Sequence, residues 1–179
     1  MKVSRFAGLT CFVLIKNSNI MERISLNDAP QGMMQVVLNV EQYIAKSGMD
    51  KKLLHLLKVR ASQINSCAYC LDMHIKEAIH NGETEKRLYS LPAWRETPYY
   101  SDKERAALAF AETLTRLPEE ENSDHIHDEL SKYFSKEEIA YLTLCIAQIN
   151  TWNRIVRSFG PVPGNYKVKE KIRETEMAN

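Results

Sequence analysis

Apolar residues recur at helical spacing along nearly the whole of this sequence. Between Asp50 and Gln63, four leucines and a valine gather on one face of a helix. No segment alternates convincingly with the two-residue period of a half-buried β-strand. The 179 residues include only six Gly and six Pro, so few turns can interrupt the chain. This pattern predicts an all-α fold.

Residues that cap helices divide this pattern into six expected helices. Asp50 has the position of an N-cap, and Ser101–Glu104 and Ser135–Glu138 have the form of capping boxes. A connection containing Pro92 and Pro98 separates the two halves. The helices are expected from about Gly32 to Lys46, from Asp50 to Gln63, from Cys67 until Asn81-Gly82, from Arg105 to Thr115, from Asp124 or His125 to Tyr133, and from Ser135 towards Arg157.

Two helical segments resemble each other. Gln63-Ile64-Asn65 recurs as Gln148-Ile149-Asn150, 85 positions later, and the expected helix starts Asp50 and Ser135 have the same spacing. This predicts a duplicated helical hairpin packed about a pseudo-twofold axis. The second copy has Trp152-Asn153 where the first copy has its cysteines, so only the first copy can carry out thiol chemistry.

Composition and charge exclude several classes of protein. The 24 basic and 23 acidic residues give a net charge of +1, which offers no excess of cations for nucleic-acid phosphates. With 44% hydrophobic and 26% charged residues, the chain has the composition of a folded domain with one core. Four cysteines are too few for a disulfide scaffold.

The two ends of the chain differ from its middle. An apolar run over residues 6–15 follows two basic residues, as in a secretory signal, but it is short and no cleavage site follows it. It is also far below the ~20 apolar residues that cross a bilayer. We expect residues 1–20 to be an extension before a natural start at Met21 or a weak signal-like segment. One all-α domain is expected over 21–166 and a charged flexible tail over 167–179.

Cys67, Cys70 and His74 form the candidate chemical site. If Asn65 or Ser66 caps the helix, Cys67 is its first residue and Cys70 lies in its first turn, where free N–H groups and the helix dipole favour a thiolate. His74 follows Cys70 by four residues, so both lie on one face and the imidazole can take the thiol proton. This predicts an activated Cys70, a base at His74, and Cys67 as the resolving thiol.

Other interpretations of the cysteines remain open. Cys67, Cys70 and His74 could be zinc ligands with His80 or His55 as the fourth, or the two thiols could be inert core residues. A c-type haem site requires His directly after the second cysteine, where this chain has Leu71. No role is expected for Cys11 or for Cys145, which stands alone in an apolar run.

The segment from Arg60 to His74, together with Ile149 to Arg154, resembles the AhpD-like branch of the carboxymuconolactone decarboxylase family, over roughly residues 31–159. The resemblance implies an AhpD-like helical bundle with an internal repeat, homo-oligomers, and reduction of hydroperoxides by thiols. It also implies a peroxidatic Cys70, a resolving Cys67, a proton relay through His74, and re-reduction by a lipoyl protein or a thioredoxin-like donor.

Two positions differ from the pattern of the best-studied members. His55 stands twelve residues before the first cysteine, where they carry a glutamate, and Tyr69 stands where they carry a histidine. His55 lies on the preceding helix, where it can face the cysteines, and its usual pKa of ~6.5 suits a proton relay. Alternatively, His55 is a polar residue of a helix surface or an oligomer contact.

We therefore expect a cytoplasmic, cofactor-free antioxidant peroxidase that acts on a small hydroperoxide and binds neither nucleic acid nor membrane. The catalytic candidates are Cys70, Cys67, His74 and His55. A Cys/His metal-binding structural protein and a cofactorless decarboxylase acting on a lactone are the alternatives.

Overall fold

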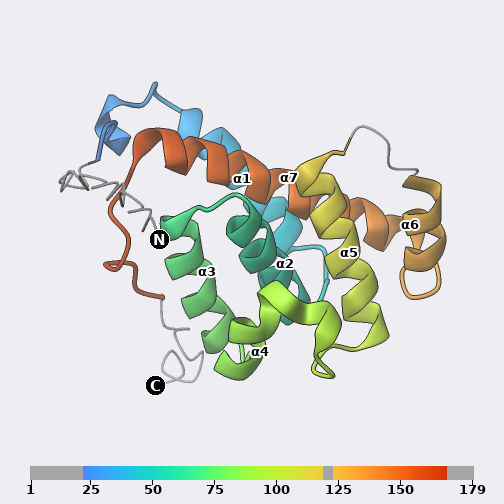
Figure 1. Cartoon of the computed structure of the whole chain (residues 1–179). Coiled ribbons are helices and arrows are strands. Elements are labelled where there is room, and N and C mark those ends of the chain that lie inside the picture. The colour runs from blue at the N-terminus through green and yellow to red at the C-terminus, as the bar shows by residue number, and fades with distance from the viewer. Residues whose placement is uncertain (1–21, 119–122, 169–179) are drawn as a thin grey trace, which may run out of the picture.

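The computed structural model describes residues 22–118 and 123–168 (Figure 1). Within these ranges there are seven α-helices, two short 3-10 helices and no strand, which confirms the predicted all-α fold. The α-helices are α1 (Met33–Ala45), α2 (Lys51–Ile64), α3 (Ala68–His80), α4 (Glu85–Ser90), α5 (Asp102–Arg116), α6 (Ser123–Leu130) and α7 (Lys136–Phe159). The 3-10 helices are η1 (Leu26–Asp28) and η2 (Leu91–Glu96).

Helices α2, α5 and α7 begin at the predicted caps. The Asp50 side chain accepts a hydrogen bond from the backbone N–H of Lys52, which satisfies one of the free donors at the start of α2. Ser101 and Ser135 form the expected capping boxes of α5 and α7. Gly160 ends α7 with φ of 75°, a left-handed conformation that glycine adopts without strain.

Three segments differ from the sequence-based prediction. The connection containing Pro92 is not irregular, because α4 and η2 fold there and bury Leu88, Leu91 and Trp94. These elements are too short to show a helical period in the sequence. α6 begins at Ser123 and ends at Leu130, before Tyr133. α3 begins one residue later than predicted, with Cys67 as its N-cap.

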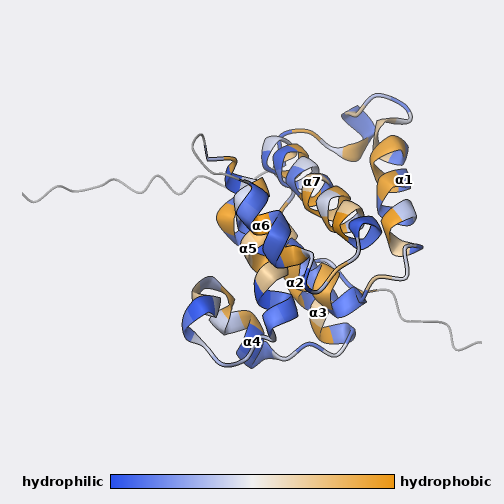
Figure 2. Cartoon of the chain, turned by 90° about the vertical axis from the view of Figure 1, so that its right-hand side faces the viewer, coloured by the Kyte–Doolittle hydropathy of each residue, from blue (hydrophilic) through white to orange (hydrophobic). Residues whose placement is uncertain are grey.

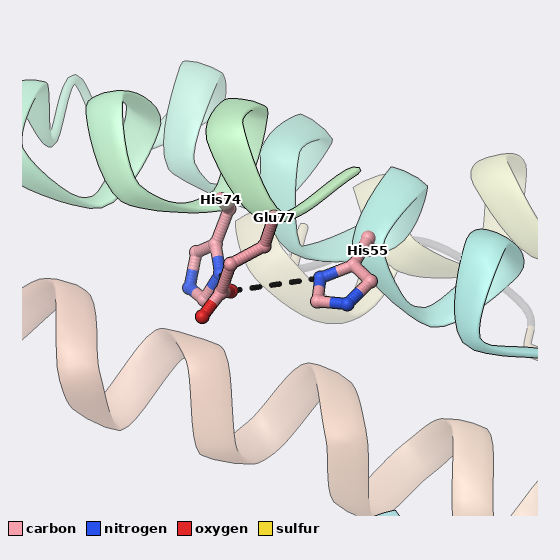
Figure 3. A group of neighbouring side chains, drawn as sticks. All are labelled: His55, His74 and Glu77. Carbon is pink, nitrogen blue, oxygen red and sulfur yellow. Dashed lines mark hydrogen bonds and ion pairs between the residues drawn. The ribbon is translucent and has the colours of Figure 1, made fainter. Parts of the chain in front are cut away.

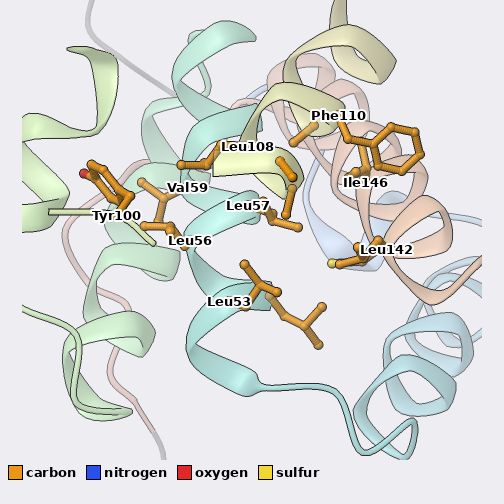
Figure 4. Close-up of a cluster of buried hydrophobic side chains, with 14 of the residues drawn as sticks. Leu53, Leu56, Leu57, Val59, Tyr100, Leu108, Phe110, Leu142 and Ile146 are labelled. Carbon is orange, nitrogen blue, oxygen red and sulfur yellow. The ribbon is translucent and has the colours of Figure 1, made fainter. Parts of the chain in front are cut away.

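Helix α2 is the centre of the molecule and packs against α3, α5 and α7 (Figure 1). Its leucines and Val59 meet the apolar faces of α5 and α7 in the main core, shown in Figure 4. Because α2 is surrounded, three of its polar residues, Lys58, Arg60 and Ser62, are buried as well. Each of them has a polar partner on another helix.

The predicted internal repeat brings equivalent residues together. The Asn65 side chain at the end of α2 donates to the side-chain oxygen of Asn150 on α7, at 2.9 Å. These two asparagines occupy the same position in the repeated Gln-Ile-Asn sequence. Their direct contact agrees with two similar units that meet near an approximate twofold axis.

Helix α1 lies against α7 and buries only Ile44 fully. It exposes apolar side chains, including Val36 and Tyr43, and its hydrophobic residues are visible in Figure 2. Among the helices that the structure describes, none is both long enough and apolar enough to cross a membrane.

Segments at both ends of the described chain are attached to the helices. The backbone N–H of Arg23 donates to the carbonyl of Phe159 at 2.7 Å. After α7, the chain follows α3, where the Lys76 ammonium donates to the carbonyls of Gly164 and Tyr166, both at 3.0 Å. The predictions for residues 1–20 (with Cys11) and most of the 167–179 tail concern residues outside those described.

Candidate active site

A cavity of about 490 Å³ lies between α1, α2, α3 and α7. The two attached end segments border it, with Leu26 on one side and Pro161 and Tyr166 on the other. Much of its wall is apolar and comes from α1 and α7, including Met34, Leu38, Trp152, Ile155, Val156 and Phe159. The polar side chains that reach it from α1, α2 and α3 are Glu41, Lys58, Tyr69, Cys70, His74 and Glu77.

Cys67 and Cys70 form a disulfide, and both are almost completely buried. Their Cα atoms are 5.3 Å apart, within the usual range for a bridged pair. A tight turn joins α2 to α3, in which the N–H of Cys67 donates to the carbonyl of Ser62. Cys70 lies in the first turn of α3 and lines the cavity, whereas Cys67 does not. Cys70 is therefore the sulfur that a molecule in the cavity would meet.

His74 lies one turn after Cys70, also lines the cavity, and has a side chain only 4% exposed. Its Nδ1 is 2.9 Å from Oε2 of Glu77, and its Nε2 has no hydrogen-bond partner. Burial lowers the pKa of His74, although the Glu77 carboxylate opposes this shift. A buried neutral imidazole with one free nitrogen can accept a proton.

His55 lies beside His74 and Glu77, as Figure 3 shows. The two imidazole rings have centroids 6.4 Å apart, and Nδ1 of His55 is 3.6 Å from Oε2 of Glu77. Burial lowers the pKa of His55 to about 4, a shift that Glu77 opposes and Lys58 supports. The structure thus places His55 next to His74, but His55 is not among the residues that line the cavity.

Sequence reasoning missed the carboxylate that joins these histidines. Glu77 is ionised, because hydrogen bonds from His74 and Tyr166 outweigh the effect of burial and lower its pKa to about 2. Tyr166 donates to Oε1 of Glu77 at 2.7 Å. The position of Glu77, three residues after His74 and therefore on the same helical face, was the available signal.

A second charged pair at the cavity, Lys58 and Glu41, was also missed. The Lys58 ammonium donates to Oε2 of Glu41 at 2.6 Å, and the Trp152 indole N–H donates to Oε1 at 3.1 Å. Burial disfavours the charged ammonium, yet Glu41 helps to hold the pKa of Lys58 above its usual value. A lysine inside the apolar run of α2 was the sequence signal for this pair.

Two residues of the sequence motifs, Arg60 and Asn153, have structural roles. Arg60 binds a carboxylate, that of Glu112, with 2.6 Å between Nη2 and Oε1. Asn153 donates to Ser62 and accepts from Asn65, which joins α7 to the end of α2. These contacts fix the turn that precedes the cysteines.

The predicted Cys/His zinc set differs from what the structure assembles. Among the described residues, the one group with metal-ligand geometry is His55, His74 and Glu77, whose ligand atoms lie within 4.8 Å of one another. It includes neither the disulfide-bonded cysteines nor His80. Cys145 is buried, which raises its pKa to about 11 and makes it a poor nucleophile.

Comparison with known proteins finds a matching family and similar bacterial proteins. The model of the carboxymuconolactone decarboxylase family matches residues 31–113. The uncharacterized protein YdfG of Bacillus subtilis is 39% identical over 140 residues, which cover 78% of this chain and 95% of YdfG. The uncharacterized protein YnjA of Escherichia coli is 29% identical over 128 residues, covering 70% of this chain and 69% of YnjA.

A solved structure shares the fold. ATU0492 of Agrobacterium tumefaciens, a protein of unknown function proposed to be the antioxidant defence protein AhpD, superposes with a TM-score of 0.77. It is 38% identical, and the match covers 82% of this chain and 100% of that chain.

Proposed function

Because this chain belongs to the AhpD-like branch of the carboxymuconolactone decarboxylase family, we propose that it is a peroxidase that reduces small hydroperoxides with Cys70 and Cys67. The observation that carries the proposal is the disulfide between these residues, one sulfur of which lines a cavity beside the buried base His74. An inert pair of core thiols would need neither the cavity nor the base.

The chemistry follows from these positions. His74 takes the proton of the Cys70 thiol, and the thiolate attacks the terminal oxygen of the hydroperoxide. The O–O bond breaks, the alkoxide leaves as the alcohol with the proton from His74, and Cys70 becomes a sulfenic acid. The Cys67 thiol then attacks the Cys70 sulfur, water leaves, and the disulfide forms.

A dithiol donor completes the cycle by reducing the disulfide through thiol–disulfide exchange. A lipoyl protein or a thioredoxin-like protein is the expected class of donor, and no dissociable cofactor is needed. The proposal includes a cytoplasmic location, where such donors are kept reduced, and a homo-oligomeric assembly.

Peroxide consumption with dihydrolipoamide or thioredoxin as the donor tests the proposal. We expect turnover by the unmodified chain, no turnover by Cys70→Ser, and a sulfenic acid on Cys70 of Cys67→Ser that dimedone traps. Cys145→Ser is the matched control, since this buried thiol lies outside the mechanism. The proposal fails if equimolar peroxide persists while Cys67 and Cys70 stay reduced.

The two alternative functions have their own tests. Stoichiometric zinc in protein purified without added metal would support a metal site, which His55, His74 and Glu77 could form. Carbon dioxide release from a lactone substrate that survives Cys70→Ser would support a decarboxylase.

A further inference from the structure

We infer that Glu77 is a positioning residue that orients His74 and stabilises its protonated form, so that Cys70 is held as a thiolate. The inference rests on the proposed function and adds a residue that the sequence motif does not include.

The first step is the orientation of the His74 ring. An ionised carboxylate can only accept, so the 2.9 Å contact with Oε2 of Glu77 requires the proton on Nδ1 of His74. The unpartnered Nε2 is then the basic atom. Figure 3 shows this second nitrogen on the side of the ring away from His55. His74 and Cys70 both line the cavity, one helical turn apart, so Nε2 is the atom available to the thiol.

The second step is the charge of Glu77. Tyr166 donates to its Oε1, and His74 donates to its Oε2. The Asn81 amide lies 3.3 Å from Nε2 of His55 and is its donor, which places the proton of His55 on Nδ1, facing Oε2 of Glu77 at 3.6 Å. Groups on α3 and in the segment after α7 thus donate to one carboxylate, and the N–H of His55 on α2 faces it without forming a hydrogen bond. They keep Glu77 charged beside His74.

The third step is the effect on Cys70. When Cys70 loses its proton to His74, an imidazolium forms in a buried place, where an adjacent negative charge stabilises it strongly. The same carboxylate repels the thiolate. Glu77 contacts His74 directly, however, and lies two helical turns from Cys70, so its attraction for the imidazolium is the larger effect. Glu77 therefore favours the thiolate–imidazolium pair.

Other charged and titratable groups also surround His74. Lys58 on α2 and Glu41 on α1 shift its pKa in opposite directions. His55 on α2 interacts with it electrostatically, and Tyr166, after α7, lines the same cavity. Lys58 and Glu41 neutralise each other at 2.6 Å, whereas Glu77 has the one carboxylate in contact with the His74 ring among the described residues. A change at Glu77 should therefore dominate the titration of the site.

The test measures alkylation of Cys70 in the reduced Cys67→Ser protein. Iodoacetamide is added between pH 5 and 10, and mass spectrometry of the Cys70 peptide gives the rate. Adding Glu77→Gln, which keeps the shape and removes the charge, should slow alkylation about tenfold at neutral pH and raise the midpoint by about one pH unit. Glu77→Asp, which keeps the charge, should recover part of the loss.

Glu85→Gln is the matched control, because Glu85 on α4 is a carboxylate that accepts from Tyr89 outside the cavity. It should change the alkylation rate by less than twofold. The inference is overturned if Glu77→Gln stays within twofold of its parent or if Glu85→Gln has an equal effect. Nitrogen NMR of the unmodified protein is a second measurement that needs no variant. It must show His74 protonated on Nδ1, and a proton on Nε2 would also overturn the inference.

Alkylation separates this inference from the proposed function because it needs no peroxide. If the unmodified chain reduces no peroxide but Glu77→Gln still shifts the alkylation midpoint, the peroxidase proposal fails and the role of Glu77 stands. If the chain turns over peroxide and Glu77→Gln changes neither alkylation nor turnover, the role of Glu77 fails alone.

Discussion

Glu112→Gln should destabilise the protein strongly, although Glu112 lies outside the cavity. The Glu112 side chain is 5% exposed and accepts from two buried groups, Arg60 at 2.6 Å and the Trp94 indole at 2.9 Å. Arg95 at 2.8 Å and Arg116 at 3.0 Å reach its other oxygen from the surface. One carboxylate therefore joins α2, η2 and α5.

The magnitude follows from the burial of Arg60, whose side chain is 10% exposed. Breaking a buried ion pair by removing one partner costs about 3–5 kcal/mol, because the remaining charge is left without compensation. The glutamine carbonyl of the variant keeps part of the hydrogen bonding, so we expect about 3 kcal/mol, a loss of roughly 100-fold in the folding equilibrium. Urea unfolding at pH 7 measures this free energy.

The pH dependence gives an independent check. Burial opposes ionisation of Glu112, but hydrogen bonds from Trp94, Arg95 and Arg60 lower its pKa from 4.5 to about 2. A depressed folded-state pKa adds stability above pH 4.5 that is lost as the pH falls towards 2. The gap in unfolding free energy between the unmodified chain and Glu112→Gln should therefore be constant near neutral pH and shrink over that acid range.

Two surface arginines provide the controls. Arg95 and Arg116 have side chains 58% and 50% exposed, so Arg95→Ala and Arg116→Ala should each cost less than about 1 kcal/mol. A loss below 1 kcal/mol for Glu112→Gln, or a gap that does not change in acid, would refute the reasoning that the buried pair with Arg60 carries the effect.

Three further predictions concern single side chains. Cys145 should resist iodoacetamide at pH 8 in the folded protein, because its pKa is about 11, and it should react once denaturant is added. Peptide mass spectrometry measures the labelling, and rapid labelling of the folded protein would contradict the prediction. Lys58→Met should lower the free energy of unfolding by roughly 1.5–3 kcal/mol, measured by urea unfolding, since Glu41 loses a charged partner. An unchanged free energy would show that the Lys58–Glu41 pair does not contribute to stability. Ser135→Ala should lower the free energy of unfolding by about 1 kcal/mol, because α7 loses its N-cap, and the melting temperature should fall. An unchanged melting temperature would mean that the capping box does not stabilise the protein.

Much of the fold was predictable because its signals are local. Caps such as Asp50 and Ser135 bind N–H groups within three residues, and apolar residues at helical spacing identify a helix wherever it packs. The spacing of Cys70 and His74 works in the same way, since four residues on a helix place two side chains on one face. The error of one residue at the start of α3 arose because Cys67, which is not a usual N-cap residue, ends the turn after α2.

The sequence by itself determined six of the seven described α-helices, most of their ends, and the register that joins the cysteines to His74. Only the tertiary structure decided that Glu77 also lies beside His55, that Lys58 pairs with Glu41, and that Tyr166 reaches the site from beyond α7. The physical reason is the separation along the chain between the residues that interact. A helical turn is specified by hydrogen bonds between residues three or four positions apart, whereas Tyr166 and Glu77 are 89 positions apart and meet only because the packing of whole helices brings them together.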